Sequence, residues 1–446
     1  MNIIENIGWI AAILAGWPLM IYVSIVCVLC TLLLRGIQFR HLSTGIRLIF
    51  SPTKKSDVGC AGDMTPIQAF VNTLSTNLGN GTIAGMATAI YAGGPGAAIW
   101  FIICSFLLMS VRYAEVFVSA LYGNKAVSAS IGGPMLYLKS MPFGGSLAYI
   151  YAILCFFYGI IGGGAIQANS ISLSLQTACN VPSILTAILM GTFVLYVGFG
   201  GAHRIVKLSN YLVPVKVGLF FGSAFIILAY YITGIPAALH LMFLSAIDPA
   251  AANAALMGIT LQQAIQYGLM RSVFASESGL GTAAILFGST GTVRPAESAL
   301  MGMMSTFVSA IVCFILALCI TVTGMWSSGL TSTALTVATF NTTFGSLGGV
   351  IVSILSIIFG LGVTVAYAYI VRACWLVIVP SKYEYGNVLL YALVSAVGAI
   401  GQVAVVWQLA DIVQALMLFV NLAALLMFVC TLRTQMIDET DQLSQA

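Results

Sequence analysis

One stretch of the chain decides its fold: Asn72-Thr73-Leu74-Ser75-Thr76-Asn77-Leu78-Gly79-Asn80-Gly81-Thr82-Ile83-Ala84-Gly85. It lies in the middle of an apolar segment, yet it is dense in glycine and in uncharged polar side chains. Each glycine costs a helix interior about 1 kcal/mol. Unwound backbone survives at membrane depth only where protein or a water-filled cavity satisfies its polar groups. We therefore expect a helix that breaks within this stretch.

The composition of the whole chain places this stretch in a membrane protein. Of the 446 residues, 60% are apolar, 16 are Lys or Arg and 12 are Asp or Glu. A soluble domain carries about a quarter charged residues, so this chain could not keep a globular surface solvated. The apolar stretches are unbroken, whereas transmembrane strands alternate apolar and polar residues. The sequence predicts an all-α polytopic membrane protein.

Roughly eleven transmembrane helices are expected, because an apolar stretch of about 20 residues crosses a bilayer. They span about residues 8–34, 66–91, 96–120, 146–177, 182–200, 209–232, 266–288, 296–324, 347–372, 387–407 and 411–432. The first helix is too long for a signal peptide and lacks a basic start. It should remain in the mature protein.

A second interruption lies in the helix expected at 266–288, where the chain reads Phe274-Ala275-Ser276-Glu277-Ser278-Gly279-Leu280-Gly281. Each interrupted helix opens a group of five, at residues 66–232 and 266–432. Because five is odd, the second group enters the membrane in the opposite sense. Interrupted helices at corresponding positions of inverted halves indicate a secondary transporter with a midplane site. The other segments are an N-terminal helix with a basic loop (1–65), an extracytoplasmic connection (233–265) and a cytoplasmic tail (433–446).

The cations between the expected helices set the orientation. They are Arg35, Arg40, Arg47, Lys54, Lys55, Arg112, Lys125, Lys139, Arg204, Lys207, Arg294, Arg372, Lys382 and Arg433. All fall on one side, so the positive-inside rule predicts an outside N-terminus and a cytoplasmic C-terminus in a cell membrane. Lys216 is expected to snorkel from its helix to the cytoplasmic interface. Arg271 falls inside a spanning segment.

The first break predicts a site for a zwitterion. A break near Gly79 to Gly81 frees N–H groups before a half helix that begins near Thr82, and its positive end suits a carboxylate. Carbonyl, hydroxyl and amide oxygens near Ser75 to Asn77 suit an ammonium group or Na⁺. The alternative for any single glycine is structural, since small residues let helices pack closely.

Three further polar positions stand out, and two of them have both a structural and a functional interpretation. An intramembrane ionisable residue such as Glu277 is a functional candidate, but it could instead stabilise the break by pairing with Arg271 or by accepting main-chain hydrogen bonds. Gln167 could line a site or satisfy neighbouring helices. Glu115, three residues after Arg112, is expected to form a structural ion pair near the cytoplasmic face.

No enzyme or cofactor signature competes with a transport function. The three histidines lie in separate segments, and most cysteines lie in apolar runs as small hydrophobes. The small net charge of +4 gives no reason to expect a nucleic-acid partner. The partners expected from these features are a zwitterion, a sodium ion and the lipid bilayer.

Several motifs carry a resemblance to a known family. Residues 80–90 followed by Gly93-Gly94-Pro95-Gly96 resemble the first broken helix of the alanine or glycine:cation symporter family. The likeness continues in order through Arg112-Tyr113-Ala114-Glu115, Gly132-Gly133-Pro134-Met135, Gln167-Ala168-Asn169-Ser170, Arg204-Ile205-Val206-Lys207, Leu212-Val213-Pro214, and Arg271 to Gly281.

The resemblance implies a leucine-transporter-like fold of ten core helices plus one N-terminal helix. It also implies Na⁺-coupled import of alanine, in either enantiomer, glycine or a similar small neutral amino acid. The implied substrate-site candidates are Asn77, Gly79, Asn80, Gly81, Gln167, Phe274, Thr364 and Ala368. Sodium candidates are Thr76, Asn77 and Thr364, and gating or structural candidates are Arg271, Glu277, Gly279 and Gly281.

The chain also departs from the family pattern. The family usually has Thr at the positions of Asn77 and Asn80, and Asn at that of Thr82. After Thr364 it often carries Gly-Trp, whereas this chain reads Tyr367-Ala368-Tyr369. A methyl group at Ala368 predicts a wider pocket unless Tyr367 or Phe274 fills the space. Two alternatives stay open, a proton-coupled carrier that uses Glu277 and a passive channel for small neutral solutes.

Overall fold

The N-terminal region of the computed structural model is divided where one helix was expected. The structure describes residues 3–50, 63–123, 132–249, 259–290, 294–401 and 403–445. In place of a continuous helix over 8–34 it has α1 (Ile3–Leu14) and α2 (Trp17–Leu33), followed by α3 (Ile37–Arg40) and α4 (Leu42–Phe50). The division falls at Ala15 and Gly16, directly before α2, whose first turn contains Pro18. Proline has no N–H with which to continue the helical hydrogen bonds.

The first group of helices contains the predicted break. It consists of α5 (Pro66–Asn77), α6 (Asn80–Gly93), α7 (Ala97–Gly123), α8 (Pro134–Tyr137), α9 (Gly144–Tyr158), a π-helical segment (Gly159–Ala165), α10 (Ile166–Cys179), α11 (Ser183–Gly198) and α12 (Gly201–Tyr230). The interruption between α5 and α6 lies at Leu78 and Gly79, within the stretch that opened the sequence analysis.

The second group contains the other predicted break, between α15 and α16. Its helices are α15 (Leu261–Ser276), α16 (Thr282–Gly288), α17 (Pro295–Val322), α18 (Ser332–Phe344), α19 (Leu347–Ile378), α20 (Tyr385–Ile400) and α21 (Val403–Gln445). The connections are more structured than expected, because α13 (Ile235–Ser245) lies between the groups and α18 lies between α17 and α19. Helix α21 also continues through the segment expected as a tail.

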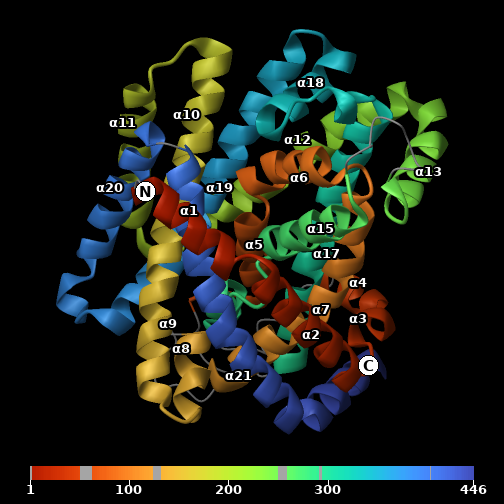
Figure 1. The fold of residues 1–446 in the computed structure, drawn as a ribbon. Coiled ribbons are helices and arrows are strands. Elements are labelled where there is room, and N and C mark those ends of the chain that lie inside the picture. Colours follow the sequence, from red (N-terminus) through yellow and green to blue (C-terminus); the bar gives the residue numbers. More distant parts are fainter. Residues whose placement is uncertain are drawn as a thin grey trace.

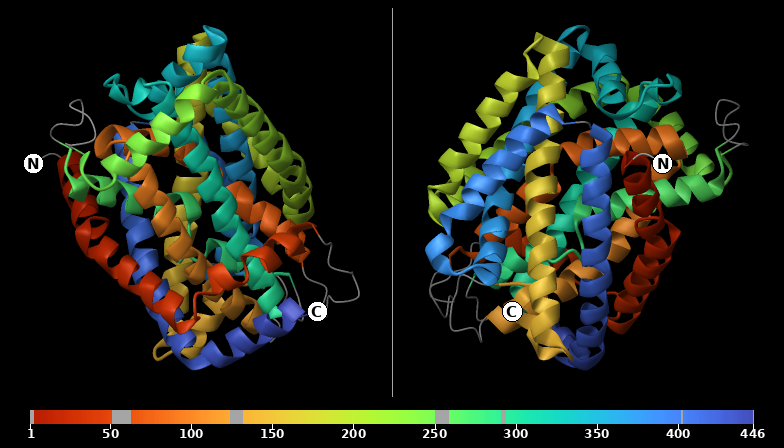
Figure 2. Two further views of the ribbon diagram at one scale, coloured as in Figure 1. Left: turned by 90° about the vertical axis from the view of Figure 1, so that its right-hand side faces the viewer. Right: turned by 60° about the vertical axis from the view of Figure 1, so that its left-hand side comes forward.

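The two broken helices lie together at the centre of the bundle (Figure 1). Helix α6 packs against α15, and α5 packs against α16. The helices that follow the two breaks, α7 and α17, pack along each other, while α19 contacts α5, α10 and α12. Figure 2 shows α11 and α20 at the periphery, where they pack together. The breaks are therefore enclosed by helices on several sides.

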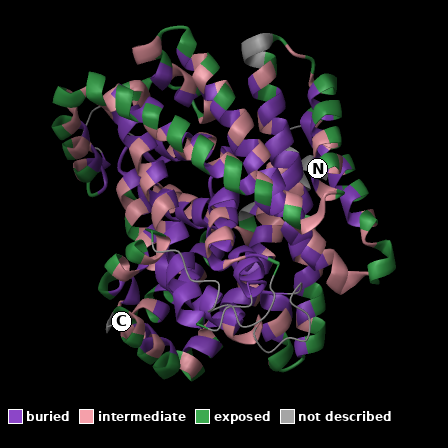
Figure 3. Ribbon diagram, turned by 180° about the vertical axis from the view of Figure 1, so that it is seen from behind, coloured by how far each residue is buried: buried purple, intermediate pink, exposed green. Residues whose placement is uncertain are grey.

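The outer surface is apolar, as a lipid-facing surface should be. Figure 3 shows the buried residues concentrated along the inner faces of the helices. The exposed side chains on α11, α12 and α20 include Ile184, Leu189, Phe225 and Leu393. Within the described ranges, six helices are long and apolar enough by themselves to cross a membrane.

Two cations, one of them counted for the orientation, do not lie where they were expected. Arg112 lies inside α7 and is fully buried, so it is not a loop cation. Lys216 in α12 is also fully buried and does not snorkel to an interface. Lys54, Lys55 and Lys125 lie outside the described residues.

Candidate functional site

Side-chain hydroxyl groups form hydrogen bonds at the end of α5, where the helical hydrogen bonds stop. The helix begins with a capping box between Thr65 and Gln68 and stops at Asn77. Its freed Asn77 carbonyl accepts a hydrogen bond from the Thr82 hydroxyl at 3.0 Å. The Ser75 hydroxyl donates to the main-chain carbonyl of Gly362 in α19 at 2.8 Å. These hydrogen bonds stabilise the unwound main chain between α5 and α6.

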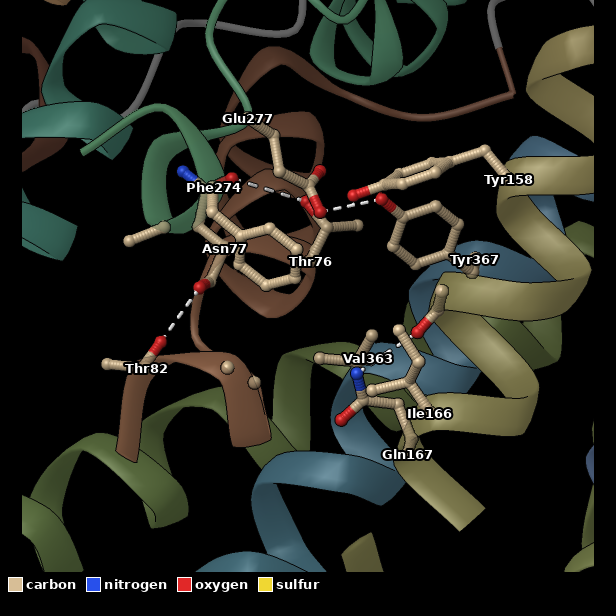
Figure 4. Close-up of a pocket in the computed structure, with 14 residues that line it drawn as sticks. Thr76, Asn77, Thr82, Tyr158, Ile166, Gln167, Phe274, Glu277, Val363 and Tyr367 are labelled. Carbon is tan, nitrogen blue, oxygen red and sulfur yellow. Dashed lines mark hydrogen bonds between the residues drawn. The ribbon is translucent and has the colours of Figure 1, made fainter. Parts of the chain in front are cut away.

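A small cavity lies between the two breaks (Figure 4). Its volume is about 20 Å³, which is room for about one water molecule. The lining residues are Thr76, Asn77, Gly79, Gly81, Thr82, Tyr158, Gly162, Ile166, Gln167, Phe274, Ala275, Glu277, Val363 and Tyr367. An amino acid therefore enters only when the lining moves.

The start of α6 presents N–H groups to this cavity. The Asn80 N–H donates to Gln167 Oε1 at 3.3 Å, while those of Gly79 and Gly81 have no hydrogen-bond partner among the described residues. A Cβ at Gly79 would lie 2.7 Å from Val363 Cγ2, and one at Gly81 would lie 2.6 Å from Phe274 Cε1. Glycine is required at both positions because the main chain itself forms the wall.

An unpaired amide donor also belongs to this wall. The side-chain nitrogen of Asn77 is buried without a hydrogen-bond partner in the described part of the chain. A buried polar group without a partner is uncommon. Together with the N–H groups of Gly79 and Gly81, it gives the cavity an end rich in hydrogen-bond donors.

Gln167 follows an irregular stretch of helix. The segment Gly159–Ala165 is π-helical, and such segments occur frequently at functional sites. The Gln167 amide donates to the Gly162 carbonyl at 3.1 Å while its oxygen accepts from Asn80. A Cβ at Gly163 would lie 2.3 Å from Tyr367 Cγ. The glycines therefore let α19 approach closely enough for Tyr367 to reach the cavity.

Glu277 faces the opposite end of the cavity. Its backbone has a φ of 52° where α15 ends. Its carboxylate accepts hydrogen bonds from the Tyr367 hydroxyl at 2.6 Å and from the Thr282 hydroxyl at 2.9 Å. The expected pairing with Arg271 is wrong among the described contacts: the Arg271 guanidinium lies over the Phe274 ring, with Cζ 5.6 Å from its centroid. Side-chain hydroxyls satisfy the carboxylate instead.

The second break is held by the ion pair expected from the spacing of Arg112 and Glu115. Arg112 Nη1 lies 3.0 Å from Glu115 Oε2, and both side chains are fully buried. Glu115 also accepts the N–H groups of Gly279, at 3.3 Å, and of Gly281, and Arg112 donates to the Ser276 carbonyl. Gly279 and Gly281 have φ values of 84° and 92°, which side chains with a Cβ rarely adopt. The pair therefore stabilises an unwound turn as well as its own helix.

Thr364 and Ala368 do not line the cavity. Helix α19 contributes Val363 and Tyr367, each one residue earlier. One residue turns a helix by about 100°, so the face of α19 that lines this cavity lies one position earlier than the resemblance implied. The Thr364 hydroxyl instead donates to the Gly163 carbonyl at 3.0 Å. The wider pocket expected at Ala368 is absent from this cavity, because Tyr367 occupies that wall.

Some of the remaining candidate residues line the small cavity and others do not. Thr76 and Asn77 line the cavity, but their third proposed sodium partner, Thr364, does not. Asn80 is turned away, with its Oδ1 accepting from Ser356 at 2.8 Å. Sequence reasoning missed Tyr158, Ile166, Ala275, Val363 and Tyr367. Apart from Ala275, which belongs to the second interruption, these residues lie in long apolar stretches, where hydrophobicity alone gives no face a distinguishing signal.

A larger cavity adjoins the first along α6 and α21. It has a volume of about 250 Å³, and Gly85, Arg271, Trp407 and Asp411 are among its lining residues. The Trp407 ring stacks on the Phe274 ring, with centroids 5.4 Å apart and an interplanar angle of 26°. Because Phe274 lines the small cavity and Trp407 the larger one, the stacked pair lies between them.

The comparisons with known proteins agree with this architecture. A family model described as the sodium:alanine symporter family matches residues 1–445. An uncharacterized transporter of Haemophilus influenzae is 32% identical over 447 residues, covering 99% of this chain and 96% of that protein. The sodium/alanine symporter AgcS of Methanococcus maripaludis is 31% identical over 408 residues, covering 89% of this chain and 88% of that protein.

A solved structure shares the fold at low sequence identity. A Na⁺-coupled sialic acid symporter in a substrate-bound outward-open state matches with a TM-score of 0.52, at 13% identity, over 92% of this chain and 85% of that one. This likeness concerns the fold alone. The predicted leucine-transporter-like fold is confirmed.

Proposed function

The chain belongs to the sodium:alanine symporter family, and from this premise we propose that it imports alanine, glycine or a similar small neutral amino acid together with Na⁺. It is a multi-pass membrane transporter of the sodium-coupled amino acid symporters, and not an enzyme. The substrate, its enantiomer and the residues that bind it are the proposed part.

One observation carries the choice of substrate: the small cavity has opposite chemical character at its two ends. Unpaired N–H groups of Gly79 and Gly81 and the Asn77 amide form the donor end. These donors, at the positive end of α6, suit a carboxylate. The oxygens of Thr76 and Glu277 form the other end, which suits an ammonium group.

The volume of the cavity supports a small side chain. Between its polar ends the walls are Ile166, Phe274, Val363 and Tyr158, which would contact an aliphatic side chain. The space of about 20 Å³ has to expand even for glycine. A methyl group needs a smaller displacement of these walls than a longer side chain does.

The orientation and the membrane are also proposed. We place the N-terminus outside and the C-terminus in the cytoplasm of the cell membrane. The contact of Arg40 with Asp441 at 3.2 Å supports a common side for the first basic loop and the C-terminal end of α21. The excess of Lys and Arg in alternate loops supports assigning that side to the cytoplasm.

Counterflow in proteoliposomes tests the proposed function. Vesicles loaded with unlabelled alanine should accumulate labelled alanine in sodium medium and not in choline medium. A panel of L- and D-amino acids identifies the substrate and its enantiomer. Equal counterflow in choline, with a dependence on pH, would replace Na⁺ by a proton as the coupling ion. Flux that neither saturates nor accumulates solute would indicate a channel.

A further inference from the structure

The first break contains a cation that the proposed function does not use. Lys216 of α12 is fully buried. Its Nζ donates hydrogen bonds to the main-chain carbonyls of Ser75, at 3.1 Å, and of Leu78, at 2.8 Å. The Ser75 hydroxyl oxygen is 3.5 Å from the same nitrogen. These carbonyls lie at the end of α5, where the last carbonyl groups of a helix lose their intrahelical partners.

In the part of the chain that the structure describes, no carboxylate forms an ion pair with this ammonium group. The ion pairs Arg40–Asp441, His41–Asp441, Arg112–Glu115 and Arg372–Glu384 do not include Lys216. From α19, Nζ is approached by the Phe359 ring, whose centroid is 5.5 Å away, and by the main chain at Gly362, where a Cβ would lie 3.0 Å from Nζ. Burying an ammonium group is costly unless it is paired. The carbonyl oxygens at the negative end of α5 supply that pairing.

The surroundings of Nζ are those of an alkali-cation site. In transporters with broken helices, unwound main-chain carbonyls and half-helix C-terminal ends coordinate the coupling ion. Lys216 places a positive charge and three N–H donors against such oxygens. We propose that the Lys216 ammonium is a built-in cation that fills this site in place of an alkali cation. That Lys216 occupies this site does not depend on the proposed function. The consequence for coupling, that the driving Na⁺ binds at another site, rests on the proposed function.

Chemical rescue of a truncated side chain tests the occupancy. Lys216→Ala leaves the Ser75 and Leu78 carbonyls facing an empty space of the size of the lost side chain. The purified variant should have a lower melting temperature than wild type. Methylammonium should raise that temperature by several degrees, whereas choline, which has no N–H donor, should not. Lys207→Ala is the matched control, since Lys207 lies on the same helix with an exposed side chain.

The proposal is overturned if methylammonium shifts the melting temperature of Lys216→Ala no more than it shifts that of wild type or Lys207→Ala. This measurement needs no transport. If wild type shows no Na⁺-dependent uptake, the proposed function fails while the rescue experiment still reports on the site.

Lys216→Met distinguishes a requirement for the positive charge from a requirement for the volume of the side chain. It serves as the test if Lys216→Ala does not fold. Methionine keeps most of the volume and removes the charge. We expect alanine uptake to fall at least tenfold below that of Lys207→Ala, with no recovery in methylammonium because the methionine occupies the space. Uptake at the wild-type rate in Lys216→Met would show that the side chain only packs, and would overturn the proposal.

Discussion

Gly81 is the residue at which the wall of the small cavity has least room. A Cβ there would lie 2.6 Å from the Phe274 ring, and a branched side chain would also cover the N–H groups at the start of α6. We predict that Gly81→Val abolishes alanine binding and uptake, because the carboxylate can no longer approach the main chain. Uptake in proteoliposomes and binding to the purified protein measure this effect.

Gly218→Val is the control for Gly81→Val, because a Cβ at Gly218 meets no atom within 4 Å. It should leave uptake unchanged. A second check uses alanine amide and ethylamine as competitors, which lack the carboxylate and should not displace alanine from wild type. Normal transport by correctly inserted Gly81→Val protein would remove this end of the cavity from the substrate site.

Val363 sets the size of the cavity from the side of α19. Its side chain lines the cavity, so Val363→Ala should make room for larger substrates without removing a hydrogen bond. Each methylene in such a pocket is worth about 1–3 kcal/mol in selectivity, so the preference for 2-aminobutyrate or valine over alanine should rise by roughly tenfold or more. A competition series from glycine to glutamine measures the change.

Val365→Ala is the matched comparison for Val363→Ala, because Val365 is buried in the same helix but does not line the cavity. It should leave the order of preference as in wild type. The same experiment with Ala368→Trp compares the two registers of α19. Exclusion of large substrates by that substitution, with no effect of Val363→Ala, would favour the register implied by the resemblance over the one in which Val363 faces the substrate.

At the scale of the elements, the second break depends on a buried ion pair supplied by α7. Glu115 pairs with Arg112 and also accepts the N–H groups of Gly279 and Gly281. We predict that Glu115→Gln lowers the stability of the protein by about 3–5 kcal/mol, since it leaves Arg112 buried without its counter-charge. Thermal unfolding of the purified protein measures the loss.

A second Arg–Glu pair provides the control for Glu115→Gln. Arg372 and Glu384 are 2.6 Å apart but partly exposed, at 25% and 34% of their side-chain surface. Pairs that water can reach contribute about 0–1 kcal/mol, so Glu384→Gln should shift the melting temperature little. Equal shifts in the two variants would mean that the unwound turn does not depend on Glu115.

Both breaks could be predicted from the sequence because their cause is local. Glycine and small polar residues weaken a helix wherever they occur in an apolar segment. The partners that hold the breaks could not be predicted, since they come from distant segments: Asn421 of α21 donates to the Gly279 carbonyl at 2.8 Å, and the Tyr151 hydroxyl of α9 donates to the Leu280 carbonyl. Lys216 was misplaced for the same reason. Its charge suggested an interface, while its partners lie on α5.

Candidate site residues divided in the same way. Of the candidates within the broken segments, Asn77, Gly79, Gly81 and Phe274 line the small cavity, while Asn80 is turned away from it. Those on continuous helices depended on register, which an apolar helix such as α19 does not reveal. Buried on several sides, it has no polar face from which the residues that face the cavity could be read.

At the scale of the whole molecule, we propose that the small cavity is the substrate site and that the larger cavity belongs to its access route. The larger cavity contains the charged side chains Arg271 and Asp411, and the smaller one lies beyond the stacked rings of Phe274 and Trp407. On this proposal, a solute that passes from the larger cavity to the smaller one displaces these rings. Closed walls around a space of about 20 Å³ favour a carrier that changes conformation over an open channel.

The last prediction concerns the charge that this conformational change moves. A neutral amino acid is a zwitterion, and Glu277 stays with the protein, so Na⁺ is the only net charge that crosses with the substrate. One charge moving through a potential of 100 mV contributes about 2.3 kcal/mol. That energy supports roughly fifty-fold accumulation before the concentration gradient of Na⁺ is added. Alanine uptake should therefore accelerate when a potassium diffusion potential makes the vesicle interior negative.

Glu277→Gln distinguishes the two coupling ions in the same vesicles. Glutamine keeps an oxygen that can accept from the Tyr367 and Thr282 hydroxyls but carries no proton that can be exchanged. If Na⁺ is the coupling ion, uptake by the variant should still rise with an interior-negative potential and should still require sodium. If a proton on Glu277 drives transport, the variant should lose accumulation, and wild type should accumulate alanine at full rate in choline medium under an inward proton gradient. Electroneutral uptake of full rate in choline or potassium medium would contradict sodium coupling directly.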